Sequence, residues 1–555
     1  MTGKLSRLHA FAFLLCLTTL VGAQTPQRTY TQADILRGAY GPYRANNDLL
    51  FYDLDVRVDP EKKFISGKNT IRFRMLKDDS RIQLDLVSTL NVDKILFSST
   101  QLKYERQFNA VFVDFPETLK KNTVYSIEFY YSGNPVSTGR FGGIAFRKDP
   151  SGHDWINTAC QGIGALVWWP NKDQQRDEVE NMRLSVEIPS TLVDVSNGQF
   201  LGKTDIGNGY TRWDWFIHYP INNYCVSLNI GNYVHFSDKL DDMTLNFYCL
   251  PENLDKARKQ FAQARTMLQC YQKYFGPYPF KKDGYKLIEV PYSGMEHQSA
   301  VTYGNHFANG YLERDWTGVG VSLKFDFIII HESAHEWFGN SITAADTSDE
   351  WIHEGWGTYA ECVYVEYMFG HEDALKYVNG YKTHVQNRQP VISQPGVNST
   401  PPQDMYFKGA LFLNTLRSMI DNDARWWKLV RDFYDHFKYQ NIMTEDVVKF
   451  FNEKTGMNLI PIFDQYLRHI DLPVLELQFL DDGSVSYRWK ADEKGFAMPV
   501  KVGRRDNWQI IQPTTEWKTM KSAVKKEDFE VATDLFYVNV TKKQVSPVKH
   551  QHSTE

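Results

Sequence analysis

Hydrophobic and polar side chains alternate with a period of two along much of the chain between residues 50 and 250. The clearest runs are residues 52–58, 71–75 and 182–188, where every second side chain is apolar. Such alternation is typical of strands that bury one face and expose the other. We therefore predict a β-sheet-rich N-terminal domain over residues 24–250.

The period changes to that of a helix near residue 250. Apolar residues follow helical spacing over residues 254–271 and again over residues 410–420 and 444–452. Thr444 is the expected N-cap of the last helix, because a threonine side chain can accept a hydrogen bond from the first turn. We therefore predict a mostly helical domain over residues 251–470.

Two short alternating runs, residues 475–479 and 485–489, flank the turn residues Asp482 and Gly483. This arrangement is typical of a β-hairpin. We predict a small β-sandwich-like domain over residues 471–545, and the expected fold class is multidomain α+β. A disordered basic tail is expected from Thr541 onward, and residues 546–555 are assigned wholly to it.

A secretory signal peptide is predicted for residues 1–23. Lys4 and Arg7 are basic, residues 11–20 are apolar, and small residues ending at Ala23 suit cleavage. The apolar run is too short to cross a bilayer, and no other window approaches the roughly 20 apolar residues of a spanning helix. We therefore expect a secreted or periplasmic protein without a transmembrane segment.

The charge and the cysteines exclude several classes of protein. Charged residues make up 23% of the chain and the formal net charge is −5, so we expect no nucleic-acid partner. Beyond the signal peptide the five cysteines form no Cys-x-x-Cys pair, which excludes a disulfide scaffold and a zinc finger. One or two bridges are compatible with an oxidising compartment, and Cys225 with Cys249 is the pairing that we predict.

Residues 331–340, with the sequence HESAHEWFGN, carry the strongest chemical signal in the chain. His331 and His335 stand one helical turn apart on one face, so both imidazoles can reach a single metal ion. The apolar residues before them predict a buried helix, for which Gly339 is the expected C-terminal stop. Glu332 then projects beside the metal, and the pattern predicts a zinc site with its own base.

A zinc site of this kind needs a third protein ligand and one position left for water. Glu354 lies 19 positions after His335, in a second predicted helix that ends before Gly370. A loop over residues 341–348 would bring it back to the metal. The metzincin alternative is rejected, because Ser341 occupies the place of the third histidine in that class.

These residues, with three further segments, resemble the M1 aminopeptidases, zinc enzymes of the gluzincin clan. The five segments are residues 160–162, 293–297, 331–340, 351–357 and 406–409, which match an upstream glutamine segment, GxMEN, HELAHQWFGN, WLNEGFA and YxKG of the family. They follow the family's order, and the resemblance covers roughly residues 45–545. It implies a thermolysin-like catalytic domain, one Zn²⁺ per chain and a peptide substrate with a free N-terminus.

The resemblance also implies a role for each site residue. The zinc ligands would be His331, His335 and Glu354, with Glu332 as the general base toward water that the metal activates. Tyr406 would stabilise negative charge on the scissile carbonyl oxygen. The other implied contacts are Glu296 to the α-ammonium group, Gln161 to the same end of the substrate, Gly294 and Met295 through backbone groups, and Glu361 to a ligand histidine. For Gln161 and Glu361, a solvated surface position is the alternative.

Three positions depart from the family pattern, since Ser293 replaces a glycine and both His297 and His353 replace asparagines. His297 is expected at the substrate-binding end, where an imidazole beside Glu296 could titrate within the working pH range. His353 should point away from the metal and serve the structure or support the ligands. A helical C-terminal domain like that of larger members is not expected, which would leave the cleft open to longer peptides.

The function expected from these residues is a secreted or periplasmic zinc-dependent aminopeptidase, with no obligatory protein partner. Three alternatives stay open. One is an epoxide hydrolase of the leukotriene A4 hydrolase type at the same zinc, and another is a thermolysin-like endopeptidase. The third is a non-catalytic peptide-binding relative, although His331, Glu332, His335, Glu354 and Tyr406 are all present.

Overall fold

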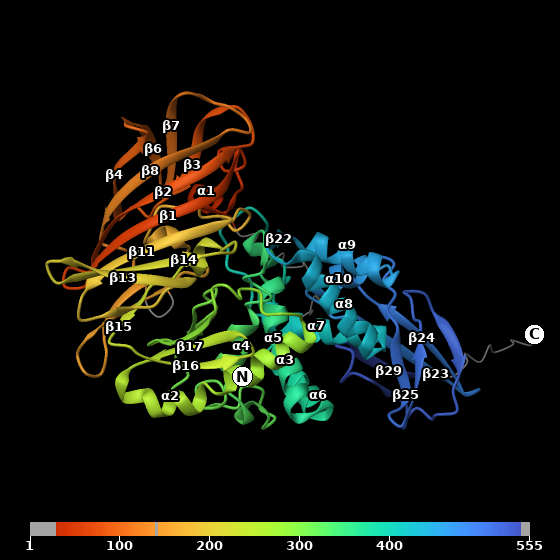
Figure 1. Cartoon of the computed structure of the whole chain (residues 1–555). Helices are drawn as coiled ribbons and strands as arrows, with labels where there is room; N and C mark the ends of the chain where they lie inside the picture. The colour runs from red at the N-terminus through yellow and green to blue at the C-terminus, as the bar shows by residue number, and fades with distance from the viewer. Residues whose placement is uncertain (1–28, 139–141, 546–555) are drawn as a thin grey trace, which may run out of the picture.

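The structure is a computed structural model that describes residues 29–138 and 142–545 (Figure 1). The predicted signal peptide, residues 1–23, and the predicted tail, residues 546–555, lie outside the described residues. Figure 1 shows three successive parts along the chain: N-terminal strands at the upper left, helices in the centre and C-terminal strands at the right. No helix in the described ranges is long and apolar enough to cross a membrane.

An eight-stranded sheet dominates the N-terminal part, in the order β13-β14-β11-β1-β2-β8-β4-β5. Strand β1 pairs antiparallel with β2 and parallel with β11. The predicted alternation is confirmed here, because Tyr52, Leu54, Val56 and Val58 are all buried. The strands are β1 (Asn47–Asp59), β2 (Phe64–Met75), β4 (Leu90–Phe97), β5 (Thr100–Gln101), β8 (Val124–Gly133), β11 (Asn181–Pro189), β13 (Gln199–Gly207) and β14 (Tyr210–Ile217).

Two smaller sheets and one short helix complete this part. Their elements are α1 (Gln32–Gly38), β3 (Asp79–Asp85), β6 (Lys103–Gln107), β7 (Ala110–Leu119), β9 (Gly143–Lys148), β10 (Asp154–Ala159), β12 (Val193–Asp194) and β15 (Asn229–Gly231). Strand β10 matters most for the site, because it leads directly into the turn that carries Gln161.

A five-stranded sheet, in the order β16-β17-β18-β20-β19, lies beside the helices. Its strands are β16 (Val234–Leu240), β17 (Met243–Cys249), β18 (Tyr285–Glu289), β19 (Gly294–Met295) and β20 (Val301–Tyr303). Strand β17 pairs with β18, and its side chains share a hydrophobic core with the helices. The division expected at residue 250 therefore falls inside this sheet. The change from strand to helix period near residue 250 marks the first helix of this part, α2 (Leu254–Gln260), whereas its sheet already begins with β16 at Val234.

The helices that follow bury a continuous apolar core. They are α2 (Leu254–Gln260), α3 (Gln263–Tyr274), α4 (Phe327–Ala334), α5 (Trp351–Phe369), α6 (His371–Gly380), α7 (Asp404–Ile420), α8 (Asp423–Phe437), α9 (Thr444–Thr455) and α10 (Ile460–Leu467), with the short strands β21 (Ile342–Ala344) and β22 (Gln440–Ile442) between them. The helices predicted at residues 410–420 and 444–452 are confirmed within α7 and α9. The coarse fold class, α+β with a sheet-rich N-terminal part and a helical part, is also confirmed.

Two details of the predicted helices are wrong. Helix α4 ends at Ala334 and not near Gly339, because the chain turns tightly after His335. Helix α9 starts at Thr444, which is its first helical residue and not its N-cap. The Thr444 hydroxyl instead donates a hydrogen bond of 2.6 Å to Asp349, the last residue of the short 3-10 turn Thr347–Asp349 that precedes α5.

The C-terminal part forms two small sheets that pack on the helical core. Its strands are β23 (Val474–Leu480), β24 (Ser484–Lys490), β25 (Val500–Arg504), β26 (Asn507–Ile511), β27 (Lys518–Lys521), β28 (Glu530–Val531) and β29 (Asn539–Val545). The predicted hairpin is confirmed as β23 and β24, while the description of this part as sandwich-like stays a prediction.

The disorder expected from Thr541 onward is wrong as far as residue 545, since β29 pairs in parallel with β23. Its side chains are mostly exposed at the sheet edge, so backbone hydrogen bonds form this strand without an apolar alternation. The predicted Cys225–Cys249 bridge is also wrong, because both thiols are free and buried. Cys225 instead donates a hydrogen bond to Asn340 at 3.1 Å.

Candidate metal centre and peptide cavity

Helix α4 carries His331, and the residue directly after it, His335, is the second of the three metal-binding candidates. Asp326 caps the helix, with its buried carboxylate accepting hydrogen bonds from the backbone of Ile328 and Ile329. The apolar residues between cap and motif fill the core, so His331 and His335 are fixed on a rigid, buried element. His335 is the first residue after the helix, yet its backbone keeps helical angles. Its ring packs edge-on against the ring of His331, with centroids 4.9 Å apart.

Three side-chain atoms converge on one point between α4 and α5. The two Nε2 atoms of His331 and His335 are 3.3 Å apart, and Oε2 of Glu354 lies 3.5 Å from the first and 3.3 Å from the second. Bonds of about 2.0–2.1 Å at tetrahedral angles place zinc ligands about 3.3–3.4 Å apart. Oε2 of Glu354 is buried and has no hydrogen-bond partner within the described protein. The three predicted ligands therefore fit a single zinc ion.

Hydrogen bonds at the Nδ1 atoms, on the side of each ring away from the metal position, fix the orientation of both imidazoles. Nδ1 of His331 lies 2.7 Å from Oε1 of Glu361, and Nδ1 of His335 lies 2.9 Å from the carbonyl oxygen of Phe338. Both acceptors require the proton on Nδ1, which leaves each Nε2 free for a metal. Tyr377 donates at 2.6 Å to the other oxygen of Glu361, and Tyr381 donates to it as well. The predicted contact of Glu361 is thus present.

Glycines allow the helices around the site to approach closely. A side chain at Gly409 of α7 would lie 2.8 Å from the Cα atom of Gly355 in α5, and a side chain at Gly357 would lie 2.8 Å from the ring of His335. The absence of a side chain at Gly409 lets α7 pack against α5, and its absence at Gly357 leaves room for the ring of His335. As a result, Tyr406 at the start of α7 lies beside His331, with ring centroids 6.0 Å apart.

A cavity of about 430 Å³ opens onto the three ligands. The predicted residues that line it are Gln161, Gly294, Met295, Glu296, His331, Glu332, His335, Glu354, Glu361 and Tyr406. Gly294 packs directly on the predicted base, since a side chain there would lie 3.0 Å from Oε1 of Glu332. Burial raises the pKa of Glu332 to about 8, and the Glu296 carboxylate acts in the same direction.

One end of the cavity is polar and negatively charged. Glu296 is buried there, its Oε1 accepts a 3.1 Å hydrogen bond from the hydroxyl of Tyr224, and burial raises the pKa of Glu296. Its backbone carbonyl accepts a 2.8 Å hydrogen bond from the side chain of Asn340, whose own backbone N–H donates to the carbonyl of His335, so Glu296 lies on the His335 side. Nε2 of Gln161 donates to Oε1 of Glu354 at 2.9 Å, so Gln161 lies at the same end.

The other end is aromatic and lies on the His331 side. Phe327 stacks on the His331 ring with centroids 5.2 Å apart, and Tyr311 lies 5.2 Å from Phe327. Trp316 contacts both Tyr311, at 5.0 Å, and Phe407, at 6.3 Å. All of these rings line the cavity, and we call Tyr311, Trp316, Phe327 and Phe407 the aromatic wall.

The two unusual histidines do not behave alike. His297 does not line the cavity, and burial lowers its pKa to about 3, so the expected titration beside Glu296 in the working pH range is wrong. His353 points away from the metal position as predicted. Its Nε2 accepts a 2.7 Å hydrogen bond from the backbone of Ala344, so it supports the loop before α5.

Sequence reasoning missed Tyr224 and the aromatic wall. Tyr224 lies in a short 3-10 turn far from every motif, and nothing in its neighbouring residues distinguishes it from the other tyrosines. Trp316 lies in an irregular segment between β20 and α4, where no periodicity predicts a direction for the side chain. Only the folded chain shows that Tyr224 contacts Glu296 and that Trp316 lines the cavity.

The architecture and the ligand geometry define a zinc metallopeptidase, with two histidines one helical turn apart and a glutamate from the next helix. Two family models match the chain: the peptidase M1 N-terminal domain over residues 50–223 and the peptidase family M1 domain over residues 260–466. The chain belongs to peptidase family M1.

Several relatives share parts of this sequence. Human endoplasmic reticulum aminopeptidase 1 is 24% identical over 352 residues, which are 60% of this chain and 36% of that protein. Aminopeptidase B of Rattus norvegicus is 26% identical over 469 residues, which are 75% of this chain and 68% of that protein. The chain thus spans much less than two thirds of the human relative's length.

A solved structure has the same fold. It is an M1 zinc metallopeptidase mutant from Deinococcus radiodurans, bound to a Tyr-Ser-Ala substrate, with a TM-score of 0.64 and 20% sequence identity. The match covers 77% of this chain and 96% of that chain. At this identity the likeness concerns the fold, and the roles of individual residues rest on the geometry above.

Proposed function

We propose that this protein is a zinc-dependent aminopeptidase that hydrolyses the first peptide bond of peptides with a free N-terminus. The observation that carries the proposal is the buried carboxylate of Glu296 at one end of the cavity, beside the three ligands. A carboxylate in that place can accept charge-assisted hydrogen bonds from an α-ammonium group. A peptide held there by its N-terminus presents its first carbonyl group near the metal position.

Each catalytic side chain has a role that its position supports. Zinc bound by His331, His335 and Glu354 would supply Lewis acidity toward a carbonyl oxygen and lower the pKa of water. Glu332 takes the proton from the attacking water and delivers it to the departing amine. The hydroxyl of Tyr406 donates a hydrogen bond to the carbonyl oxygen as negative charge grows there.

The aromatic wall supports a preference for the second residue of the peptide. The N-terminal residue occupies the end near Glu296, so the chain beyond the cleaved bond runs toward the His331 side. There Trp316, Phe327 and their neighbours offer an apolar surface. Aromatic or large aliphatic second residues should therefore bind better than small or acidic ones.

We also propose that the protein works outside the cytoplasm. This proposal rests on the signal-like sequence of residues 1–23. N-terminal sequencing of the exported protein tests it, because removal of these residues should expose an N-terminus at residue 24. Export without cleavage, or retention in the cytoplasm, would contradict the proposal.

The activity is tested with aminoacyl-p-nitroanilides and their N-acetylated forms, for the wild type, Glu332→Gln and the control Glu366→Gln. Glu366 lies on α5 and pairs with Arg417, away from the cavity lining. Only free-amine substrates should be cleaved, and only Glu332→Gln should lose activity by several orders of magnitude. Cleavage of acetylated substrates would indicate a thermolysin-like endopeptidase instead. Peptide binding without cleavage by zinc-loaded wild type would indicate the non-catalytic alternative.

A further inference from the structure

A tight turn over residues 160–164 carries Gln161 from the end of β10 into the cavity. The backbone of Gly164 donates to the carbonyl of Cys160 at 2.7 Å, and Ile163 donates to that of Gln161 at 2.8 Å. Gly162 and Gly164 both have positive φ angles, 72° and 89°, which side-chain-bearing residues rarely adopt. The position of Gln161 therefore depends on how this turn is held.

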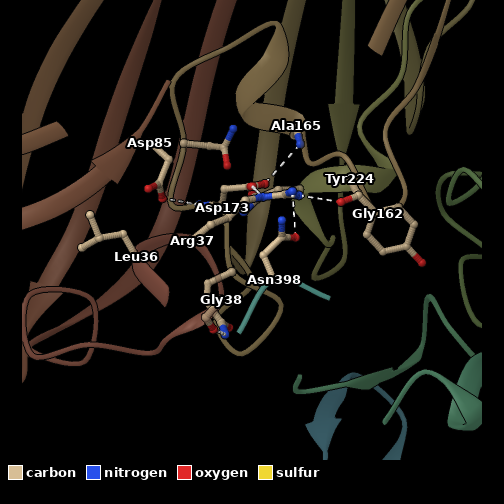
Figure 2. Close-up of polar contacts among 12 residues, drawn as sticks. Leu36, Arg37, Gly38, Asp85, Gly162, Ala165, Asp173, Tyr224 and Asn398 are labelled. Carbon is tan, nitrogen blue, oxygen red and sulfur yellow. Dashed lines mark hydrogen bonds and ion pairs between the residues drawn. The ribbon is translucent and has the colours of Figure 1, made fainter. Parts of the chain in front are cut away.

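Arg37 of α1 holds the turn from outside (Figure 2). Its Nη2 donates to the carbonyl of Gly162 at 2.8 Å, and its Nε donates to Oδ2 of Asp173 at 3.2 Å. Its Nη1 donates to Oδ1 of Asn398 at 2.9 Å. The other oxygen of Asp173 accepts the backbone N–H of Ala165 at 3.1 Å. Arg37 and Asp173 together thus bind the middle of the turn and the residue that follows it.

Gly164 of the turn lies directly against Arg37 and Asp173. A side chain at Gly164 would lie 2.6 Å from Nη2 of Arg37 and 2.3 Å from Oδ2 of Asp173. The ion pair is largely shielded, with 22% of the Arg37 side chain and 8% of the Asp173 side chain exposed. Such a pair is screened less by solvent and salt than a surface pair, so it fixes geometry better.

Helix α1 is itself held by side chains of the N-terminal part of the chain. The side chain of Gln83 donates to the carbonyl of Leu36 at 3.2 Å, Gln174 donates to that of Gly38 at 3.1 Å, and Arg44 donates to that of Arg37 at 2.8 Å. These three polar contacts hold the helix end that carries Arg37. The guanidinium group is therefore presented by a fixed backbone.

The partner of Arg37 on the other side, Asn398, belongs to the helical part of the chain. Its segment leads into α7, which carries Tyr406. Figure 2 shows Arg37 between Gly162 and Asn398, with Tyr224 beyond the turn. Arg37 thus joins the turn of Gln161 to the segment that leads into α7. It also precedes residue 50, where the match to the family model begins.

We infer that Arg37 is a positioning residue for Gln161, and through it for the end of the cavity that receives the substrate's N-terminus. The inference rests on the proposed function. Without the guanidinium group, the carbonyl of Gly162 and the carboxylate of Asp173 lose their shared donor. The turn then samples other conformations, and the amide of Gln161 is no longer held at Glu354.

The experiment is a double-mutant cycle with Arg37→Ala, Gln161→Ala and the combined variant, using a free-amine dipeptide substrate. Arg57→Ala is the matched control, because Arg57 forms an exposed ion pair on the N-terminal sheet. We expect Arg37→Ala to raise KM about tenfold with kcat changed less than about threefold and zinc content unchanged. In the Gln161→Ala background the same change should have no further effect on KM. Arg37→Lys, which can keep one of the three contacts, should be intermediate.

Two outcomes overturn the inference. One is an unchanged KM in Arg37→Ala, even if the thermal midpoint falls. The other is a KM effect that multiplies in full with that of Gln161→Ala, because Arg37 would then act independently of Gln161.

A failure of the proposed function is recognised separately, as a zinc-loaded wild type that cleaves no free-amine substrate. Hydrogen exchange of the Gly164 and Ala165 amides then decides the inference alone. Faster exchange in Arg37→Ala than in Arg57→Ala supports the inference, and equal exchange in the two variants overturns it.

Discussion

Glu361 lies behind the metal position, and its replacement by glutamine tests how much the ligand geometry depends on it. The two oxygens of Glu361 accept hydrogen bonds from His331, Tyr377 and Tyr381. Glutamine has nearly the same volume but offers only one oxygen, and its amide nitrogen is a donor. Glu361→Gln therefore leaves the core filled while at least one donor loses its acceptor and the His331 ring loses a charged partner.

The magnitude follows from these contacts. A hydrogen bond to a charged group contributes roughly 1.5–3 kcal/mol, and loss of such a contact behind a ligand histidine weakens metal binding by about 10–100-fold. We expect the zinc Kd to rise by that factor, which equals about 1.4–2.7 kcal/mol. Glu332 and Tyr406 do not contact Glu361 through any of these bonds, so kcat at saturating zinc should stay within about threefold of the wild type.

The assay combines zinc competition against a chromogenic chelator with activity measured over a range of free zinc concentrations. Glu366→Gln is the control, since it removes a carboxylate from the same helix, about one and a half turns further on. The reasoning is refuted if Glu361→Gln binds zinc within twofold of the wild type. It is equally refuted if saturating zinc fails to restore activity in a variant that remains folded.

Three further predictions follow from the cavity and the core. Tyr406→Phe should lower kcat by about 100–1000-fold while KM and zinc content persist, and a kcat near wild type in steady-state kinetics would remove its proposed role. Trp316→Ala should lower kcat/KM about tenfold for Leu-Phe-type substrates and little for Leu-Gly-type ones, and equal losses for both would count against the aromatic wall as a selective surface. Burial raises the pKa of Asp194 to about 7, so its contribution to stability is full below about pH 4 and lost as pH rises through about 7. The amide of Asp194→Asn does not ionise in this range, so the thermal midpoint of the variant relative to that of the wild type should rise by a few degrees from about pH 4 to about pH 8. A difference in thermal midpoint that stays constant with pH would contradict the ionisation of a buried Asp194.

The parts of the site that the sequence predicts are those encoded by local spacing. His331 and His335 lie one turn apart in the sequence and in the structure, and Glu354 comes from the next helix as expected. The alternation of residues 52–58 predicts a strand for the same reason, because period and burial are linked within a few residues. Patterns within a single helix or strand therefore predict the structure of that element correctly here.

The parts that the sequence does not predict depend on contacts between distant segments. The hydrogen bond from Tyr224 to Glu296 and that from Arg37 to Gly162 each join residues with no shared motif or period. Strand β29 is missed because its exposed side chains give no alternation, although its backbone pairs along β23. In each case a partner far away in the sequence determines the position of the residue or strand, and residue spacing along the chain does not identify that partner.

The motifs at residues 351–357 and 406–409 contain glycines in addition to the residues that the chemistry requires, and the packing of the helices explains why. Binding a metal needs only Glu354 in one string, and stabilising the carbonyl oxygen needs only Tyr406 in the other. Yet Gly355 follows the first and Gly409 lies three residues after the second, and these two glycines meet where α5 and α7 touch. A side chain at either position would separate the helices and move Tyr406 away from the ligands. Each string therefore encodes a reactive group together with the packing that brings it to its partner, which is why the two must occur together to form the site.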